Sequence, residues 1–122
     1  MHKCHFLILI FMAGILSSCG FTNFTEKADS QFADQHFKTA IANIELYNIR
    51  YGKYPSTLGD LTFMGDWDKM IFQSLSYEKL DTGYRLDIVK SVFGAVPSDL
   101  SYPKEFWKGL GLKRSNVLKK PQ

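Results

Sequence analysis

The fold is decided by one stretch of sequence, Phe37-Lys38-Thr39-Ala40-Ile41-Ala42-Asn43-Ile44-Glu45-Leu46-Tyr47-Asn48-Ile49-Arg50-Tyr51-Gly52-Lys53-Tyr54-Pro55. Its apolar residues recur at steps of three and four, which places them along one side of a helix. They are Phe37, Ala40, Ile41, Ile44, Tyr47 and Tyr51, and Phe32 extends this apolar surface upstream. We predict a helix from Asp29 to Tyr51, roughly six turns long, with Asp29 or Ser30 as its N-cap. Gly52 suits the left-handed residue that ends a helix, and Pro55 forbids its continuation.

A hairpin is predicted downstream, between Ser74 and Val89. Apolar and polar residues alternate along both arms, and Asp81-Thr82-Gly83 supplies turn residues between them. Alternation of period two puts the apolar residues of both arms on one face, which we expect to cover the helix. These residues are Leu75, Tyr77, Tyr84, Leu86 and Ile88.

The remaining segments carry weaker patterns. We expect Leu58 and Leu61 to fold back under the helix, and a short helix at Pro103 to Lys108. Val92, Phe93 and Val96 are candidates for a further strand, and Phe106, Trp107, Leu110 and Leu112 for burial. A helix followed by a small antiparallel sheet is an α+β domain, with one sheet face on the helix. We assign this domain to residues 31–112, and we expect residues 113–122 to form a basic, frayed tail.

The N-terminal residues have the features of a secretory signal. Lys3 supplies positive charge, and the apolar run from Phe6 to Leu16 is eleven residues long, about half of what crosses a ~30 Å hydrocarbon core. Leu16-Ser17-Ser18-Cys19 resembles a lipobox, the pattern that lipoprotein signal peptidase recognises. The resemblance implies a signal peptide at residues 1–18, lipid attachment at Cys19, and a lipidated tether over residues 19–30. The alternative is an ordinary signal peptide with a cysteine near its cleavage site.

Charge and cysteine content narrow the possible functions. Cys4 would leave with the signal and Cys19 would carry lipid, so no thiol remains for a disulfide, a metal site or a nucleophile. From Cys19 onward there are fourteen Lys or Arg against twelve Asp or Glu, a balance that implies no strong electrostatic partner. Lys113, Arg114, Lys119 and Lys120 form a basic cluster. We interpret it as a solvated tail, with contact to anionic headgroups as the alternative.

The segment Ala40 to Pro55, with Leu58 and Leu61 following, resembles a segment of the type II secretion pseudopilins, most clearly the major pseudopilin. These proteins have a helix that ends in a tyrosine-rich turn and a Gly-basic-Tyr-Pro step, followed by spaced leucines. The specific part of the resemblance consists of Tyr47, Tyr51, Gly52, Tyr54 and Pro55, while Trp67, Tyr77 and Gly83-Tyr84-Arg85-Leu86 fit the family's order more loosely. The resemblance implies a pseudopilin-like globular domain and a place beside secretion or pilus machinery.

The chain departs from pseudopilins in one respect. A pseudopilin keeps a long apolar helix after its processing site, whereas residues 23–29 are polar here. The apolar half-helix that builds a filament core is therefore missing from the expected mature chain. The calcium site of the major pseudopilin also has no matching acidic loop near the C-terminus.

We find no residue set typical of catalysis, and no cofactor is implied. His36 is the only histidine after Cys19, so we predict no metal site and a partly exposed helical residue. Asp66 and Asp68 flank Trp67, and we expect them to be exposed charges around a buried tryptophan. A glycine-rich phosphate loop, a Gly-x-Ser-x-Gly elbow and a basic stripe interleaved with aromatics are all missing, so nucleic acid is not an expected ligand.

The leading hypothesis is a non-catalytic lipoprotein in the cell envelope, an interaction or accessory component of a secretion-type or pilus-type assembly. Gly20 in place of aspartate after the lipidated cysteine favours the outer membrane over the inner membrane. The candidate partner surface consists of the aromatics Trp67, Tyr102, Phe106 and Trp107. A small ligand-binding module is the alternative, and a wall-acting enzyme with Asp66 or Asp68 in a cleft is a third.

Overall fold

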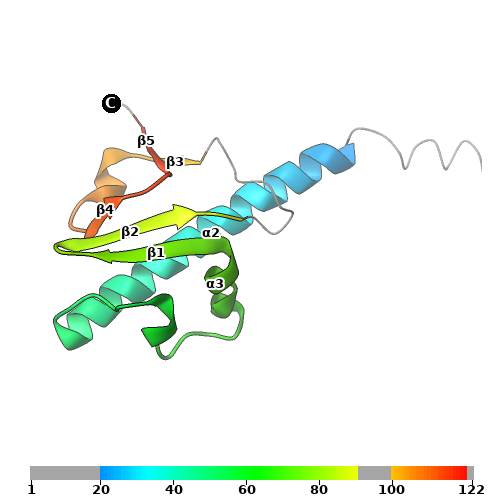
Figure 1. Cartoon of the computed structure of the whole chain (residues 1–122). Helices are drawn as coiled ribbons and strands as arrows, with labels where there is room; N and C mark the ends of the chain where they lie inside the picture. The colour runs from blue at the N-terminus through cyan, green and yellow to red at the C-terminus, as the bar shows by residue number, and fades with distance from the viewer. Residues whose placement is uncertain (1–19, 91–99, 121–122) are drawn as a thin grey trace, which may run out of the picture.

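The longest element is helix α2, Gly20–Tyr51, in a computed structural model that describes residues 20–90 and 100–120 (Figure 1). The predicted core face of the helix is confirmed, since Phe37, Ala40, Ile41 and Ile44 are all buried. Within the described residues, no helix is both long enough and apolar enough to cross a bilayer.

The start of α2 differs from the prediction. Asp29 and Ser30 lie inside the helix, so neither is its N-cap, and the segment expected to be a tether is helical from Gly20 onward. No proline interrupts residues 20–36, and Glu26, Lys27 and Ala28 are adequate helix formers, so the chain continues the helix upstream of its apolar stripe. Phe32 and Tyr51 are exposed, and the predicted buried stripe is wrong at both of its ends.

The end of α2 follows the prediction. Gly52 adopts a left-handed backbone with φ of +70°, and its N–H donates to the Asn48 carbonyl at 2.8 Å. Beyond it, Leu58 in the 3₁₀ helix η1 (Leu58–Asp60) and Leu61 pack into the core, as expected.

The predicted hairpin is confirmed. A second 3₁₀ helix, η2 (Trp67–Met70), leads into the short helix α3 (Ile71–Ser74), and strands β1 (Leu75–Leu80) and β2 (Gly83–Ile88) follow. The two strands pair antiparallel, with Leu75 opposite Ile88 and Leu80 opposite Gly83. Tyr84, Leu86 and Ile88 are buried while Arg85 between them is exposed, as strict alternation requires.

The C-terminal residues form more structure than the sequence predicts. They contain β3 (Ser101–Tyr102), the 3₁₀ helix η3 (Lys104–Trp107), β4 (Leu112–Arg114) and β5 (Leu118–Lys119). Strand β4 pairs parallel with β2, and β3 pairs parallel with β5. The main sheet, in the order β1-β2-β4, is therefore mixed rather than antiparallel. The short strand β4 lies beside β2 after a crossover through η3, and such a crossover leaves no local pattern in the sequence.

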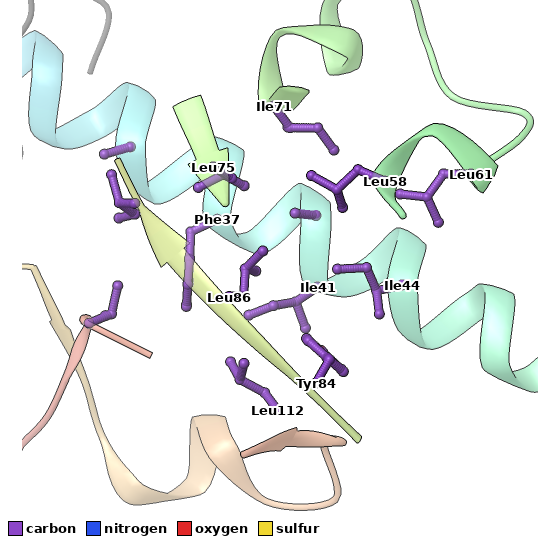
Figure 2. Close-up of a cluster of buried hydrophobic side chains, with 14 of the residues drawn as sticks. Phe37, Ile41, Ile44, Leu58, Leu61, Ile71, Leu75, Tyr84, Leu86 and Leu112 are labelled. Carbon is purple, nitrogen blue, oxygen red and sulfur yellow. The ribbon is translucent and has the colours of Figure 1, made fainter. Parts of the chain in front are cut away.

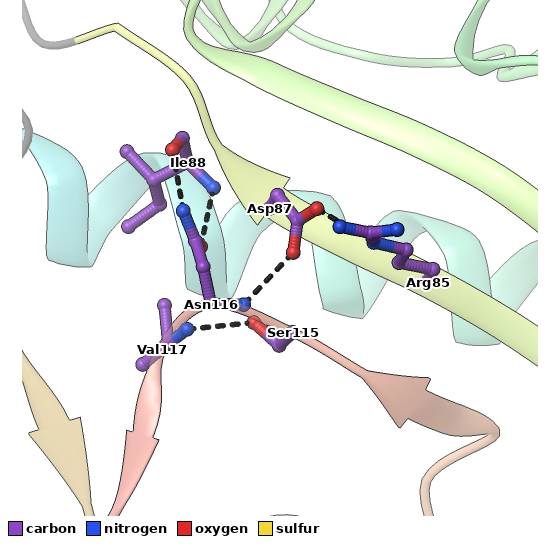
Figure 3. A network of polar contacts seen from close by, with 6 residues as sticks. All are labelled: Arg85, Asp87, Ile88, Ser115, Asn116 and Val117. Atoms are coloured by element: carbon purple, nitrogen blue, oxygen red, sulfur yellow. Dashed lines mark hydrogen bonds and ion pairs between the residues drawn. The ribbon is translucent and has the colours of Figure 1, made fainter.

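The expected frayed tail is wrong for residues 113–120. Asn116 donates from Nδ2 to the Ile88 carbonyl at 2.8 Å and accepts the Ile88 N–H at 2.9 Å, while its own N–H donates to Asp87 (Figure 3). Val117 is buried beside this network. The Asn116 side chain thus holds residues 113–120 at the end of β2. Apolar periodicity did not predict this ordered segment, because the contact that holds it is polar.

The core lies between α2 and one face of the hairpin (Figure 2). Phe37, Ile44, Ile71, Tyr84 and Leu86 are its largest fully buried apolar side chains, apart from Pro55. Val92, Phe93 and Val96 lie outside the described residues, as do residues 121–122 and the signal and lipobox residues 1–19, so those predictions remain expectations. The coarse α+β class, a long helix against a small sheet, is the architecture observed.

Candidate functional site

Tyr54 of the Tyr47 to Pro55 motif contacts a carboxylate that sequence reasoning did not single out. Glu45 lies on α2, where its Oε2 accepts the Tyr54 hydroxyl at 3.0 Å and its Oε1 accepts the Tyr84 hydroxyl at 3.0 Å. The Gly111 N–H also donates to Oε1, at 2.7 Å. Glu45 therefore joins the turn after α2, strand β2 and the segment before β4. The sequence feature that could have indicated this role is the position of Glu45, an acidic residue directly after the buried Ile44.

The tyrosines of this cluster serve as hydrogen-bond donors and packing surfaces. Burial, reinforced by the Glu45 hydrogen bond, raises the pKa of Tyr54 to about 12. Burial and the Glu45 charge raise the pKa of Tyr84 still further. The Tyr54 ring also lies against Gly111, where any Cβ would collide with it. Tyr54 and Tyr84 thus perform a structural task, because their hydroxyls stay protonated at neutral pH and bind Glu45.

The predicted partner surface is split by the fold. Tyr102 is only 6% exposed, so its assignment as an exposed partner residue is wrong. Its ring stacks on Phe106 at 4.1 Å between centroids and on Phe37 at 5.8 Å, and its hydroxyl donates to Asp34 at 2.7 Å. Phe106 is half-buried in this stack, and the half-buried Trp107 packs edge-on against it. These three aromatics complete the core where the hairpin does not reach.

Trp67 lies in a different region, which we call the turn flank, residues 52–74 between α2 and β1. In Figure 1 the hairpin of β1 and β2 lies between this flank and the C-terminal flank, residues 100–120. The tryptophan expected to be buried is 83% exposed, and Phe63 is 85% exposed. Sequence reasoning missed Phe63, although its position in a polar loop beside Thr62 was a signal.

Phe63 is also the only residue other than glycine with positive φ in the described part of the chain, at +61°. The Arg50 guanidinium lies 5.2 Å from the centre of its ring. A left-handed backbone is uncommon for a bulky residue and costs of order 1–3 kcal/mol. The fold therefore holds a large aromatic ring outward at an energetic cost, beside a cation from the last turn of α2.

The C-terminal flank carries a hollow of about 330 Å³, which we call the basic groove. Its lining residues are Trp107, Leu112, Lys113, Arg114, Ser115, Val117 and Lys119. Three of these are cations that the sequence placed in a frayed tail. The strong excess of Lys and Arg after residue 100 is the sequence feature that could have indicated a basic groove.

The remaining titratable candidates have structural roles. His36 is buried rather than partly exposed; its Nδ1 lies 3.1 Å from the Ser74 hydroxyl, and burial lowers its pKa. The Asp66 side chain is 97% exposed, as expected, so it does not lie in the cleft that the enzyme alternative requires, and it pairs with Lys69. Asp68 accepts the Gly65 N–H at 3.1 Å. Across the described ranges, no group of three His, Cys, Asp or Glu side chains is placed to hold a metal ion.

The lipobox residues Leu16, Ser17, Ser18 and Cys19 lie outside the described residues, so lipidation stays a prediction. Two aromatic regions are thus observed, the exposed turn flank and the stacked C-terminal flank with its basic groove. Comparison with known proteins adds no family to this geometry. The chain matches no protein-family model, no curated protein and no solved structure.

Proposed function

We propose that this chain is a lipid-anchored, non-catalytic docking module that serves a secretion-type or pilus-type assembly of the cell envelope. The anchor is Cys19, within Leu16-Ser17-Ser18-Cys19. The type of assembly rests on the resemblance of Tyr47 to Pro55 and its surroundings to the pseudopilins, which is an analogy of sequence. The docking role rests on the surface chemistry of the turn flank.

The exposed aromatic pair on the turn flank is the observation that carries this proposal. Phe63 and Trp67 are more than four-fifths exposed, and Ile49 on the last turns of α2 is 78% exposed. Contiguous exposed apolar patches mark interaction sites, and aromatic residues with an adjacent Arg, such as Phe63 beside Arg50, are the usual anchors of such sites. The strained backbone at Phe63 fits the same role, because strain tends to persist where function requires a fixed side-chain direction.

A non-catalytic role is supported by how the polar groups are used. The Glu45 carboxylate is occupied by three donors, and Asp60 accepts the N–H groups of Ser56 and Thr57. The Asp87 carboxylate is bound to Arg85 and to the Asn116 N–H. Each of these carboxylates has a structural task, which leaves none of the three as a general acid or base.

The N-terminal part of α2 suits a spacer between lipid and domain. Thirteen residues, Gly20 to Phe32, precede Ala33, the first helical residue of the apolar core. At ~1.5 Å per residue, this helical segment is about 20 Å long, enough to link the lipidated residue to the core.

The test is affinity purification from detergent-solubilised envelopes, with a tag after Gln122 and an untagged strain as control. We expect a specific envelope protein to co-purify with the wild type and to be lost from the double variant Phe63→Ala and Trp67→Ala. The matched control is Phe24→Ala, which removes an exposed aromatic from the other end of α2. Co-purification that survives in the double variant would overturn the turn flank as the docking surface.

The anchor is tested separately by labelling cells with radioactive palmitate. The wild-type chain should incorporate label and sediment with membranes, while Cys19→Ala should do neither. Unchanged labelling of the variant would refute the anchor.

The ligand-binding alternative retains support from the basic groove, whose dimensions and lining suit a small molecule.

A further inference from the structure

The charge of this chain is segregated along its length. Residues 100–120 hold six Lys or Arg and one Glu, whereas residues 19–99 hold eight Lys or Arg and eleven Asp or Glu. A near-neutral total therefore hides a strongly basic C-terminal flank. Such asymmetry is typical of chains that meet an anionic ligand or surface.

The fold gathers part of this charge around the basic groove. Lys113, Arg114 and Lys119 line it together with Leu112, Val117 and Trp107, and no carboxylate is among the lining residues. A second hollow on Trp107 is lined by Lys104, Lys108 and Glu105. The Trp107 side chain therefore lines two hollows, and cations line each of them.

The cations of the groove form no ion pair within the described part of the chain, and Lys113 and Arg114 also line a neighbouring hollow that contains Glu78 and Asp81. The ion pairs within residues 20–90 and 100–120 join Lys38 to Asp34, Lys69 to Asp66 and Arg85 to Asp87. None of these pairs uses a cation of the basic groove. Lys119 Nζ instead lies 5.5 Å from the centre of the Trp107 ring, which leaves its charge available to an incoming anion.

The groove is held in place by backbone and side-chain hydrogen bonds. Asn116, which lies between β4 and β5, is hydrogen-bonded through its side chain to the Ile88 backbone on β2. The Lys120 N–H donates to the Tyr102 carbonyl at 2.9 Å. A ligand would therefore meet a preformed site and would not have to order a flexible tail.

We propose that the basic groove binds the phosphate-bearing headgroup of an anionic phospholipid. The three cations supply charged hydrogen-bond donors for the oxygens of a phosphodiester. The apolar floor of Leu112 and Val117, with Trp107 as wall, suits the glycerol and first methylenes of a lipid, since tryptophan and lysine are favoured together at membrane interfaces. A volume of about 330 Å³ holds one headgroup rather than a polymer. The choice of a lipid as the source of phosphate rests on the membrane anchor proposed above.

The experiment uses the full chain in neutral detergent micelles, with Trp107 as reporter. The chain has two tryptophans, so Trp67→Phe leaves Trp107 as the single emitter. Short-chain phosphatidylglycerol is titrated in, with short-chain phosphatidylcholine and inorganic phosphate as parallel arms. We expect a saturable shift in Trp107 emission with phosphatidylglycerol alone. An equal shift with phosphatidylcholine, an equal shift with inorganic phosphate, or no shift in any arm would each overturn the proposal.

A pair of charge-matched variants sharpens the result. The groove variant combines Lys113→Gln, Arg114→Gln and Lys119→Gln, and the control combines Lys27→Gln, Lys53→Gln and Lys90→Gln, all exposed cations outside the groove lining. We expect phosphatidylglycerol to bind the groove variant on the order of a hundredfold more weakly, at about a factor of five per cation. Equal weakening in the control would overturn the site. Because the titration uses dispersed lipid, its outcome is independent of palmitate labelling at Cys19.

Discussion

The turn flank and the C-terminal flank lie on either side of the β1–β2 hairpin (Figure 1), and both are rich in aromatic residues. On the turn flank, Phe63 and Trp67 extend into solvent with little covering them. On the C-terminal flank, Tyr102 and Phe106 stack on each other and on Phe37 of the helix, and Trp107 packs edge-on against these rings. Aromatic residues therefore stabilise the fold on one side of the hairpin and remain available for contact on the other.

The difference comes from what lies opposite each flank. The C-terminal flank meets the apolar stripe of α2 at Phe37, so its rings gain burial and the Tyr102 hydroxyl finds Asp34. The turn flank is connected to the core through Leu58, Leu61 and Ile71, with Tyr54 and Met64 packed against it, whereas Phe63 and Trp67 are exposed. Aromatic content by itself does not distinguish a core from an interface; the distinction depends on which apolar surface is within reach.

The largest expected effect comes from removing Phe37, which the aromatics of the C-terminal flank contact, and comparing the result with removal of Trp67 on the turn flank. Phe37→Ala is expected to lower the free energy of unfolding by about 3–5 kcal/mol, because a fully buried ring is lost from the stack. Trp67→Ala should change it by less than about 0.5 kcal/mol, because its ring is exposed. Urea unfolding followed by far-UV circular dichroism measures both. Phe37→Leu, with an expected loss of about 1–2 kcal/mol, serves if the alanine variant does not fold. Similar losses for Phe37→Ala and Trp67→Ala would abolish the distinction.

Glu45 is where the two flanks are joined, so its removal should loosen both. Glu45→Ala leaves the Tyr54 and Tyr84 hydroxyls and the Gly111 N–H without their acceptor, and we expect a loss of about 2–4 kcal/mol. The control is Glu78→Ala, an exposed carboxylate on β1, with a change of less than about 0.5 kcal/mol. The same unfolding measurement applies. A loss no larger than that of the control would mean that the three contacts contribute nothing net.

Asn116 tests whether the C-terminal flank depends on one polar side chain. Asn116→Ala removes both side-chain hydrogen bonds to the Ile88 backbone, and a loss of about 1–2 kcal/mol is expected. Hydrogen exchange should quicken at Ile88 and through residues 112–119 while the hairpin register near Leu80 keeps its protection. The matched control is Gln73→Ala, an exposed amide beside the hairpin. Uniform acceleration across the domain would instead indicate global destabilisation.

The smallest expected effect is a pH dependence of stability that arises from Tyr54 and Tyr77. Burial, with the Asp60 charge as a second cause, raises the pKa of Tyr77 to about 12, and the pKa of Tyr54 is raised to the same value. The unfolded chain ionises near pH 10, so their contribution to stability is complete below pH 10 and is lost as the pH rises towards 12. Tyr77→Phe should shrink this alkaline decline, although it removes the hydrogen bond to the Pro55 carbonyl. Unfolding free energies at pH 8, 10 and 11 measure it, and an unchanged slope would contradict the assignment.

The sequence by itself determined the local elements. The spacing of Phe37, Ala40, Ile41 and Ile44 predicted the buried face of α2, Gly52 predicted its end, and alternation around Asp81-Thr82 predicted the hairpin and its buried face. These features depend on backbone periods of 3.6 and 2 residues and on the φ values that glycine and proline allow, and each is encoded within about twenty neighbouring positions.

The tertiary structure alone decided the state of the C-terminal flank and the content of the candidate sites. Strand β4 is parallel to β2, Tyr102 is buried, and Lys113, Arg114 and Lys119 line a groove because Asn116 and Gly111 find partners on β2 and α2. The Gly111 N–H reaches Glu45 across 66 positions of sequence, and the Tyr102 hydroxyl reaches Asp34 across 68. Hydrogen bonds of such separation follow no local period, so their geometry exists only once the helix and the sheet have packed together.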